Sequence, residues 1–475
     1  MKKVLFATSE VYPLVKTGGL GDVSAGLPTA LRELGQQVVI VLPAYRDALA
    51  RLQCCECVAT LDVSSCGNQR QVQIFRAQAD GLSCPLLLIK IDTLFDRSGS
   101  PYQDSDGNDW WDNGERFGLF AKIVTELACD RLGLDWHPDV VHCNDWQTGL
   151  VPALLQLEKE PPLTVFTIHN LAYGGHFPHE LFVGLDLPPS WWHYQQIEFH
   201  GGMSMLKAGI VFADHVATVS PSYAQEICTA ELGCGLHGAL QQRQQQGRLH
   251  GFVNGIDSHV WNPQKDPYLP YHYSLKRGRV AQKKRNKQVL LEQLNVEKIC
   301  AVIPAFIQQT DACFVVIGSG QEHLERAVSQ LARRYPQRVF VHIGYSESLA
   351  HLLEAGADLF LMPSRFEPCG LNQMYSLTYG TPAIVHATGG LKDTVVDTCA
   401  ESLENLSATG FVFQPDTAEA LREAMHRGID LYRRPRSWQK LQKIGMGQDF
   451  SWHCRANCYL DLYLHGGSDD YSATR

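Results

Sequence analysis

Residues 3–42 read KVLFATSEVYPLVKTGGLGDVSAGLPTALRELGQQVVIVL. The apolar runs Val4–Thr8 and Val38–Leu42 are typical of buried parallel strands. Five apolar residues between them recur every three or four positions: Leu20, Val23, Leu27, Leu31 and Leu34. This spacing predicts one buried face of a helix that ends before Gly35. Strand, glycine turn, helix and strand within about forty residues form the βαβ unit of a Rossmann-type fold.

Short apolar, often β-branched runs continue along the whole chain and alternate with helical stretches. They lie at Val140–His142, Val165–His169, His215–Val219, Phe252–Asn254, Phe314–Ile317, Val339–Ile343, Leu359–Met362 and Ala383–Val385. Such alternation predicts an α/β protein with parallel sheets covered by helices. A chain of 475 residues is long enough for two such domains.

An internal repetition supports two domains. Lys16–Val23 (KTGGLGDV) recurs loosely as Ala387–Thr394 (ATGGLKDT), again between an apolar run and an amphipathic stretch. We therefore expect two doubly wound, Rossmann-like domains that face each other across a cleft, each with a glycine turn at the carboxyl ends of its strands. The boundary is predicted near Asn254–Asp257.

Composition excludes several classes of protein. The net charge is −9, and no Lys/Arg run of the kind that follows a phosphate backbone occurs, so nucleic acid is not an expected partner. No stretch approaches the ~20 apolar residues of a membrane span. The apolar run after Lys3 is too short for a signal peptide, which predicts a cytoplasmic protein.

Cysteine usage agrees with a cytoplasmic location. The 15 cysteines are scattered and odd in number, which favours reduced thiols over disulfides. Cys54, Cys55, Cys57 and Cys66 are close enough in sequence to suggest a metal site. Cys54 and Cys57 have Cys-x-x-Cys spacing, but no second such pair lies at zinc-finger distance, so we expect no metal.

The first glycine turn has the chemistry of an anion site. Lys16–Gly19 leads into a helix whose first N–H groups are free and whose dipole favours negative charge, and Lys16 adds a cation. A bound phosphate is one interpretation, and an ordinary tight turn is the other. Gly318-Ser319-Gly320 is a partial dinucleotide fingerprint without its third glycine, so an NAD-dependent oxidoreductase stays an alternative.

A second candidate site follows the run Leu359–Met362. Glu367 lies in the loop Ser364–Leu371, at the edge of the sheet where ligands bind in this class of fold. Its carboxylate could accept hydrogen bonds from sugar hydroxyls or stabilise developing positive charge, and it could equally cap the next helix. The amides of Cys369, Gly370 and Leu371 lie at the start of that helix and could bind oxygen atoms.

Polar and aromatic side chains also follow two runs of the first domain. His142–Trp146 ends one run, and His169–Tyr173 ends the next. Planar side chains beside amides and carboxylates are typical of sugar recognition. Each histidine by itself could instead be structural.

Six separated motifs, in this order, resemble those of bacterial glycogen synthases and plant starch synthases. They are Lys16–Val23, His142–Trp146, His169–Tyr173, Asn254–Asp257, Arg365–Gln373 and Thr388–Asp393. The resemblance extends from Met1 to about Leu464. It implies a GT-B fold and transfer of glucose from ADP-glucose, with retention, to the non-reducing end of an α-1,4-glucan such as glycogen, without a metal or another cofactor.

The resemblance also implies residue roles. Lys16, Gly18 and Gly19 would contact the diphosphate, and Asp22 would lie beside the sugar and the acceptor path. His169 and Asn254 would hold the glucosyl hydroxyls. Residues that would complete the donor pocket are Glu367 beside the transferred sugar, the amides of Cys369, Gly370 and Leu371, Tyr345 on the adenine and Thr394 near the ribose. Asp145 and Trp146 would face the glucan.

The domains implied are 1–253 on the glucan side and 254–450 on the nucleotide-sugar side, with a helix at 451–466 that crosses back to the first domain. One family feature is absent. The Ser-Arg-Leu-x-x-Gln-Lys-Gly segment, whose Arg and Lys grip the departing diphosphate, is missing near 298–299. Loss of one charge-assisted donor can cost ~10² to 10³ in rate, so a catalytically impaired glucan-binding homologue is the alternative.

The absent segment also includes an apolar strand that would occupy the middle of the second sheet. Ile299–Ile303 is the run that could replace it. Pro304 weakens this possibility because proline cannot donate a hydrogen bond to a central strand.

Overall fold

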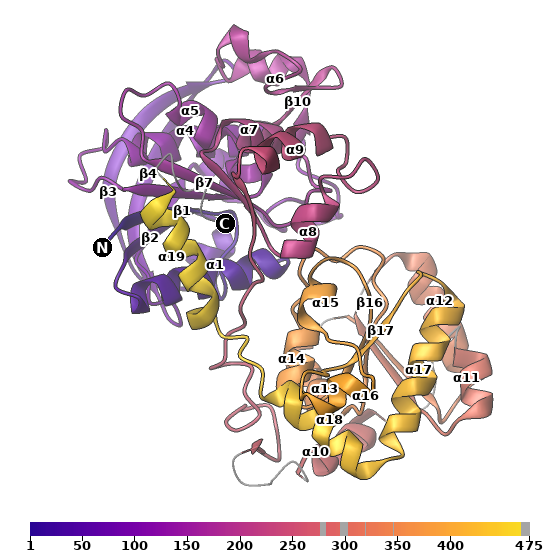
Figure 1. Cartoon of the computed structure of the whole chain (residues 1–475). Coiled ribbons are helices and arrows are strands. Elements are labelled where there is room, and N and C mark those ends of the chain that lie inside the picture. The colour runs from indigo at the N-terminus through magenta and orange to yellow at the C-terminus, as the bar shows by residue number, and fades with distance from the viewer. Residues whose placement is uncertain (276–281, 295–302, 319, 345, 467–475) are drawn as a thin grey trace. The chain divides into compact units, whose positions relative to one another are not determined.

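The computed structural model describes residues 1–275, 282–294, 303–318, 320–344 and 346–466 (Figure 1). The chain forms two compact units. The first unit is Met1–Asp257 together with the segment from Phe450 onward, and the second unit is Ser258–Asp449.

One large sheet forms the centre of the first unit. Among the described residues its order is β12-β11-β7-β6-β1-β2-β5-β4-β3. The strands are β1 (Lys3–Ala7), β2 (Gln37–Pro43), β3 (Leu52–Ser65), β4 (Asn68–Ala79), β5 (Leu86–Lys90), β6 (Val140–Asn144), β7 (Leu163–Ile168), β11 (His215–Thr218) and β12 (Leu249–Gly251). All neighbours from β12 to β5 pair in parallel, and β4 pairs antiparallel with both β5 and β3. The strands β8 (His176–Phe177), β9 (Glu198–Phe199) and β10 (Gly202–Ser204) form a small separate sheet.

Helices cover the large sheet. They are α1 (Gly19–Glu33), α2 (Arg46–Leu49), α3 (Asp92–Phe95), α4 (Asn113–Ala128), α5 (Leu150–Leu155), α6 (His179–Gly184), α7 (Met205–Phe212), α8 (Pro221–Glu226), α9 (His237–Gln245) and α19 (Trp452–His465), with 3-10 turns at Trp146–Thr148 and Pro189–Trp191. The helix predicted from Leu20 is α1. Its apolar face is buried at Leu20, Val23, Leu27 and Leu31, as the spacing of these residues requires.

The first sheet differs from the prediction in several details, and one is that β5 (Leu86–Lys90) was not among the predicted strands. Phe252–Asn254 is not a strand, because the last strand is β12 (Leu249–Gly251) and the following residues leave the sheet at its carboxyl end. The long antiparallel hairpin of β3 and β4 was not predicted. It turns at Cys66 and Gly67, which both have a positive φ (50° and 77°).

Helix α19 completes the core of the first unit and lies beside α1 (Figure 1). Trp452 fills the space beside Gly26 and Gly255, where a β-carbon would come within 2.0 and 2.7 Å of its indole ring. Tyr463 is buried and shares a 2.5 Å hydrogen bond with Nδ1 of His142. Helix α19 is therefore part of the first unit's interior.

The second unit contains two parallel sheets among its described residues. One pairs β13 (Phe314–Gly318) with β14 (Val339–Ile343), and the other has the order β15 (Phe360–Met362), β16 (Ala383–His386), β17 (Phe411–Phe413). Nine helices of the described residues accompany them: α10 (Gln282–Leu294), α11 (Ile303–Gln309), α12 (Glu322–Arg334), α13 (Glu347–Gly356), α14 (Asn372–Thr378), α15 (Gly389–Thr394), α16 (Ala400–Glu404), α17 (Ala418–Tyr432) and α18 (Pro435–Met446).

The division into two sheets falls at the centre of the expected Rossmann order. In the order 3-2-1-4-5-6, strand 1 lies between strands 2 and 4. Here β14 and β13 correspond to strands 3 and 2, β15 to β17 correspond to strands 4 to 6, and no described strand takes position 1. All residues of β13 and β15 are only partly buried, whereas β6 is buried throughout.

The run proposed as a replacement strand does not form one in its described part. Ile303 is the first residue of α11, and Ile299–Val302 lie outside the described residues. Pro304 is the second residue of that helix. The N–H groups of a helix's first turn have no partner within the helix, so a proline there costs no hydrogen bond.

Two negative findings apply to the described part of the chain. No helix there is long and apolar enough to cross a membrane. No group of three His, Cys, Asp or Glu side chains there could hold a metal ion, and this includes the thiols of the hairpin.

Candidate active site

The parallel strands of the first unit place their following loops at one edge of the sheet. Glu10 comes shortly after β1, Asp145 directly after β6, His169 directly after β7 and Asn254 shortly after β12. This edge is where ligands bind in open α/β sheets.

Glu10 holds the glycine turn that precedes α1. Its buried carboxylate accepts hydrogen bonds from the Thr17 amide (2.6 Å), the Thr17 hydroxyl (2.5 Å) and the Gly18 amide (3.3 Å). The hydroxyl of Tyr102 donates a further bond to it (2.6 Å). Because Glu10 takes the Thr17 and Gly18 amides, an incoming anion would be left with the N–H groups from Gly19 onward and with Lys16.

Lys16 and Asp22 lie together at this turn. The ammonium group is 2.9 Å from the carboxylate of Asp22, and both side chains remain partly exposed. Lys16 also lies over the ring of Tyr12, with its Nζ 5.7 Å from the ring centre. Asp22 thus orients a cation that stays open to solvent at the N-terminus of α1.

Asp145 and His169 are joined by the loops after β6 and β7. The Asp145 carboxylate accepts hydrogen bonds from the amides of His169 (2.7 Å) and Asn170 (3.4 Å). Burial raises the pKa of Asp145 to about 7, and the nearby charge of Glu10 acts in the same direction. Asp145 has a φ of 56°, a conformation that favours glycine and that costs energy in other residues.

His169 is held as a neutral ring. Its Nε2 lies 2.9 Å from the side-chain oxygen of Asn144, which can only accept, so Nε2 carries the proton. The Asn144 amide group donates in turn to the carbonyl of Ala7 (3.0 Å). Burial lowers the pKa of His169 to about 3. In this tautomer Nδ1 is an acceptor for a hydroxyl group.

His142 lies within β6 and is buried, whereas Trp146, directly after Asp145, is half-buried and packs against other aromatic rings. His142 is fully buried between the hydroxyls of Tyr463 and Thr167, so its structural interpretation is correct. The indole of Trp146 packs edge-on against Phe117, with ring centres 5.0 Å apart, and lies beside Phe177 at 5.7 Å.

Asn254 carries an unsatisfied polar atom. The residue is 4% exposed, and its Oδ1 has no hydrogen-bond partner among the described residues. A buried acceptor of this kind is costly unless a ligand or water supplies a donor. Asn254 belongs to the first compact unit, which ends at Asp257.

Glu367 lies in the loop between β15 and α14 of the second unit. Burial raises the pKa of its carboxyl group, and a 3.1 Å hydrogen bond from the Ser364 hydroxyl opposes this shift. The Glu367 carbonyl accepts a bond from the Gly390 amide (3.2 Å). The loop is thereby fixed to the start of α15.

The second glycine turn packs against the Glu367 loop. A β-carbon on Gly389 would lie 2.1 Å from the Glu367 carbonyl oxygen, and one on Gly390 would lie 2.2 Å from the Cys369 carbonyl oxygen. These glycines are therefore needed for close contact between two loops, whereas Gly18 has open space around it.

Gln373 ties the remaining second-unit candidates together. Its side-chain amide donates to the carbonyls of Cys369 and Gly370 and to the Thr394 hydroxyl, each at 3.0 Å. Thr394 is buried and donates to the Gly390 carbonyl at 2.6 Å. Leu371 is the N-cap of α14. Tyr345 lies outside the described residues.

The structure thus brings candidate residues together within each unit. The first unit brings together Lys16 with Asp22, and Asp145 with His169, and the second unit brings together Glu367, Cys369, Gly370 and Thr394. Sequence reasoning missed Glu10 and Gln373. The position of Glu10 just after a buried strand was a usable signal, and its partners depend on tertiary structure.

Comparison with known proteins identifies the family to which the chain belongs. A family model described as "Starch synthase catalytic domain" matches residues 3–242, and one described as "Glycosyl transferases group 1" matches residues 273–443. The chain is 52% identical to a glycogen synthase of Hydrogenovibrio crunogenus, over 97% of this chain and 99% of that protein. The chain belongs to the glycogen and starch synthase family. A glycogen synthase of Thioalkalivibrio sulfidiphilus is 48% identical over the same shares of the two chains.

Solved structures agree with this family. The catalytic domain of starch synthase IV from Arabidopsis thaliana, bound to ADP and acarbose, has a TM-score of 0.86 and 29% identity, and covers 98% of this chain and 99% of that one. A sucrose-phosphate synthase from Thermosynechococcus elongatus shares the fold at 16% identity, with a TM-score of 0.57 over 98% of each chain. The chain has the α/β GT-B fold and is a glycosyltransferase, so the predicted fold and family are confirmed.

The same comparisons bear on the alternatives. They favour a glycogen synthase over an impaired homologue and over an NAD-dependent oxidoreductase, and the family uses a nucleotide-sugar donor and a glucan acceptor. The alignment with the Hydrogenovibrio protein spans 486 positions, more than the 475 residues of this chain. That relative therefore has residues for which this chain has no counterpart.

Proposed function

We propose that this glycosyltransferase moves glucose from ADP-glucose, with retention, to the non-reducing end of an α-1,4-glucan in the cytoplasm, without a metal or another cofactor. The main observation behind the proposal is the arrangement of the loops at the carboxyl edge of the first sheet. There Glu10 fixes a cationic turn, and Asp145 fixes a neutral His169. The likeness to a starch synthase domain bound to ADP and acarbose supports this donor and this class of acceptor.

The diphosphate would bind at the turn before α1. Lys16 supplies a full charge, and the first amides of the helix supply donors along the dipole. The residues proposed to contact the diphosphate are Lys16, Gly18 and Gly19, with Asp22 orienting the cation. Since Glu10 takes the Gly18 amide, we assign Gly18 the role of close approach, for which its lack of a side chain leaves space.

The glucosyl group would be held by polar atoms with free capacity. His169 would accept a hydrogen bond from a sugar hydroxyl at Nδ1 while its Nε2–H donates to Asn144. Asn254 offers its unpartnered Oδ1 to another hydroxyl. Asp145 sets the position of the His169 amide, and with Trp146 it would line the path of the glucan.

Glu367 would act on the transferred sugar. A carboxylate beside the anomeric carbon stabilises the positive charge that develops as the bond to the leaving diphosphate breaks. In the same pocket, the Cys369, Gly370 and Leu371 amides would bind oxygens, Tyr345 would pack on adenine, and Thr394, through its contact with Gln373, would support the ribose end. Apart from the donor contacts of Lys16, Gly18, Gly19 and His169, residues 1–253 would serve the glucan and residues 254–450 the nucleotide sugar, with 451–466 returning to the first domain.

The test is ADP release by the purified full-length chain given ADP-glucose and glycogen, with the Lys16→Ala variant beside it. Turnover that the variant loses supports the proposal, and it also means that other groups compensate for the absent Arg and Lys. Transfer from UDP-glucose alone would refute the donor assignment. Glycogen binding without turnover would instead indicate a synthase fold that has lost its chemistry.

A further inference from the structure

Trp111 is an exposed aromatic residue with no role in the site described above. Its side chain is 86% exposed, more than any other large apolar side chain in the described residues. Burial of so large an apolar surface is favourable, so a fold that leaves it in water gives up stability. The adjacent residue Trp110 is only partly exposed, so the two neighbouring indoles have different surroundings.

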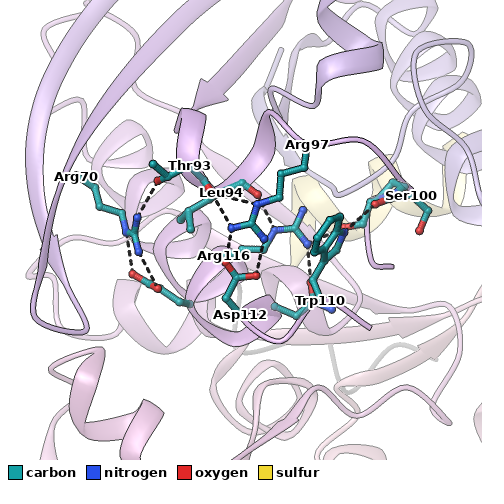
Figure 2. Close-up of polar contacts among 11 residues, drawn as sticks. Arg70, Thr93, Leu94, Arg97, Ser100, Trp110, Asp112 and Arg116 are labelled. Atoms are coloured by element: carbon teal, nitrogen blue, oxygen red, sulfur yellow. Dashed lines mark hydrogen bonds and ion pairs between the residues drawn. The ribbon is translucent and has the colours of Figure 1, made fainter. Parts of the chain in front are cut away.

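The backbone around Trp111 is fixed on both sides. Before it, the Trp110 amide donates to the Tyr102 carbonyl (3.0 Å), and the Trp110 indole N–H donates to the Ser100 carbonyl (3.2 Å). After it, the buried carboxylate of Asp112 pairs with the Arg97 guanidinium through two bonds of 2.8 and 2.6 Å (Figure 2).

Charged groups stabilise this segment from within. Figure 2 shows Arg97 and Arg116 side by side near Trp110 and Asp112, and both guanidinium groups lie over the Trp110 ring, at 5.0 and 5.8 Å from its centre. Arg116 is buried and also bonds the Leu94 carbonyl (2.9 Å). These contacts fix the residues on both sides of Trp111, so its indole is presented to solvent from a well-ordered segment.

The segment belongs to the ligand-binding edge of the sheet. It follows β5, whose parallel pairing with β2 puts its carboxyl end at the same edge as that of β1. Tyr102 anchors it there, because its hydroxyl bonds both the Glu10 carboxylate (2.6 Å) and the Ser9 hydroxyl (2.8 Å). The residue that holds the cationic turn therefore also holds the loop that carries Trp111.

Planar polar groups accompany the indole. Gln103 and Asp109 form an isolated antiparallel bridge in this loop, and their exposed side chains are hydrogen-bonded at 3.1 Å. An exposed aromatic face beside amide and carboxylate groups matches a sugar ring, which has an apolar face and a rim of hydroxyls. A membrane surface would instead favour basic residues around the indole, and this loop contains Asp104, Asp106 and Asp109.

We propose that Trp111 is a contact for the α-glucan, a platform on which a glucose ring of the acceptor stacks outside the reaction centre. The inference rests on the proposed function, because it takes the glucan as the ligand of this edge. Its effect is on acceptor affinity and not on the donor or the chemical step.

The experiment compares the full-length chain with Trp111→Ala in co-sedimentation with glycogen, in the absence of ADP-glucose. Stacking of one ring predicts a dissociation constant about tenfold higher in the variant. In turnover assays the KM for glycogen should rise to a similar extent, while the KM for ADP-glucose and kcat stay unchanged. Trp111→Phe keeps an aromatic face and should retain most of the affinity.

Tyr194 supplies a matched control, because it is also an exposed aromatic of the first unit (66%), and Tyr194→Ala should bind glycogen as the unchanged chain does. Equal glycogen binding by the Trp111→Ala variant overturns the inference and leaves the proposed function standing. A chain that neither binds glycogen nor releases ADP overturns both. Loss of self-association in the Trp111→Ala variant, with glycogen binding intact, would assign the indole to a second copy of the chain and overturn the glucan assignment.

Discussion

Replacing Glu10 with Gln isolates the contribution of one buried carboxylate to the cationic turn. In the native chain the carboxylate accepts four hydrogen bonds, three from Thr17 and Gly18 and one from Tyr102. Gln has nearly the same shape, but it carries no charge and turns an NH₂ group toward at least one of these donors. The variant therefore loses charge-assisted bonds and leaves buried donors unpaired.

The size of the effect follows from these bonds. Hydrogen bonds to charged groups contribute about 1.5 to 3 kcal/mol each, and partial replacement by the amide oxygen leaves a net loss of about 3 kcal/mol in the free energy of unfolding. For a unit of this size the loss corresponds to a Tm lower by about 6 to 12 °C. Because the turn carries Lys16, the KM for ADP-glucose should also rise, and more than the KM for glycogen.

Calorimetry and ADP-release kinetics measure both consequences. Glu198→Gln is the matched control, since the Glu198 carboxylate accepts a 2.7 Å bond from the Gly201 amide at an exposed position and its loss should change Tm little. If the Glu10→Gln variant has the same Tm as the native chain and the same KM for ADP-glucose, the turn does not depend on this carboxylate and the reasoning fails.

Three further changes test the rest of the site. Glu367→Gln keeps shape and removes charge, so turnover should fall by about 10² to 10³ with no loss of Tm; an active variant would remove Glu367 from the sugar. The raised pKa of Asp145 means that the folded chain binds the extra proton, so stability should decline as pH rises from about 4 to about 7, and Asp145→Asn should flatten that decline in Tm measured against pH. Gly390→Ala places a β-carbon against the Cys369 carbonyl and should cost about 3 kcal/mol in urea unfolding, whereas Gly320→Ala, with open space around it, should cost little.

The first βαβ unit could be predicted from sequence because its signals are local. The spacing of Leu20, Val23 and Leu27 identified the buried face of α1, and the flanking apolar runs are strands β1 and β2. The hairpin of β3 and β4 escaped prediction because its edge strand alternates weakly, with several exposed thiols where apolar residues would be expected. Cys66 and Gly67 at its turn were the signal that could have identified it.

The candidate site was predictable only as far as residue types allow. Motif positions named Asp145 and His169, but the left-handed backbone of Asp145 and the proton on His169 Nε2 depend on contacts between loops. The sequence repetition predicted the second glycine turn but not the reason for its glycines. Gly390 is required because a carbonyl from another loop lies against it, a requirement that no local pattern reveals.

The place of α19 in the first unit has a consequence for the order in which the protein is made. Trp452, Tyr459 and Tyr463 belong to the interior of a unit whose other residues end at Asp257. A ribosome delivers them only after it has synthesised the whole second unit, so the usual order of N-terminal domain first is reversed here. Until then the nascent chain exposes the cavity beside Gly26 and leaves His142 without its tyrosine partner. The second unit can therefore fold completely before the first unit receives its last helix.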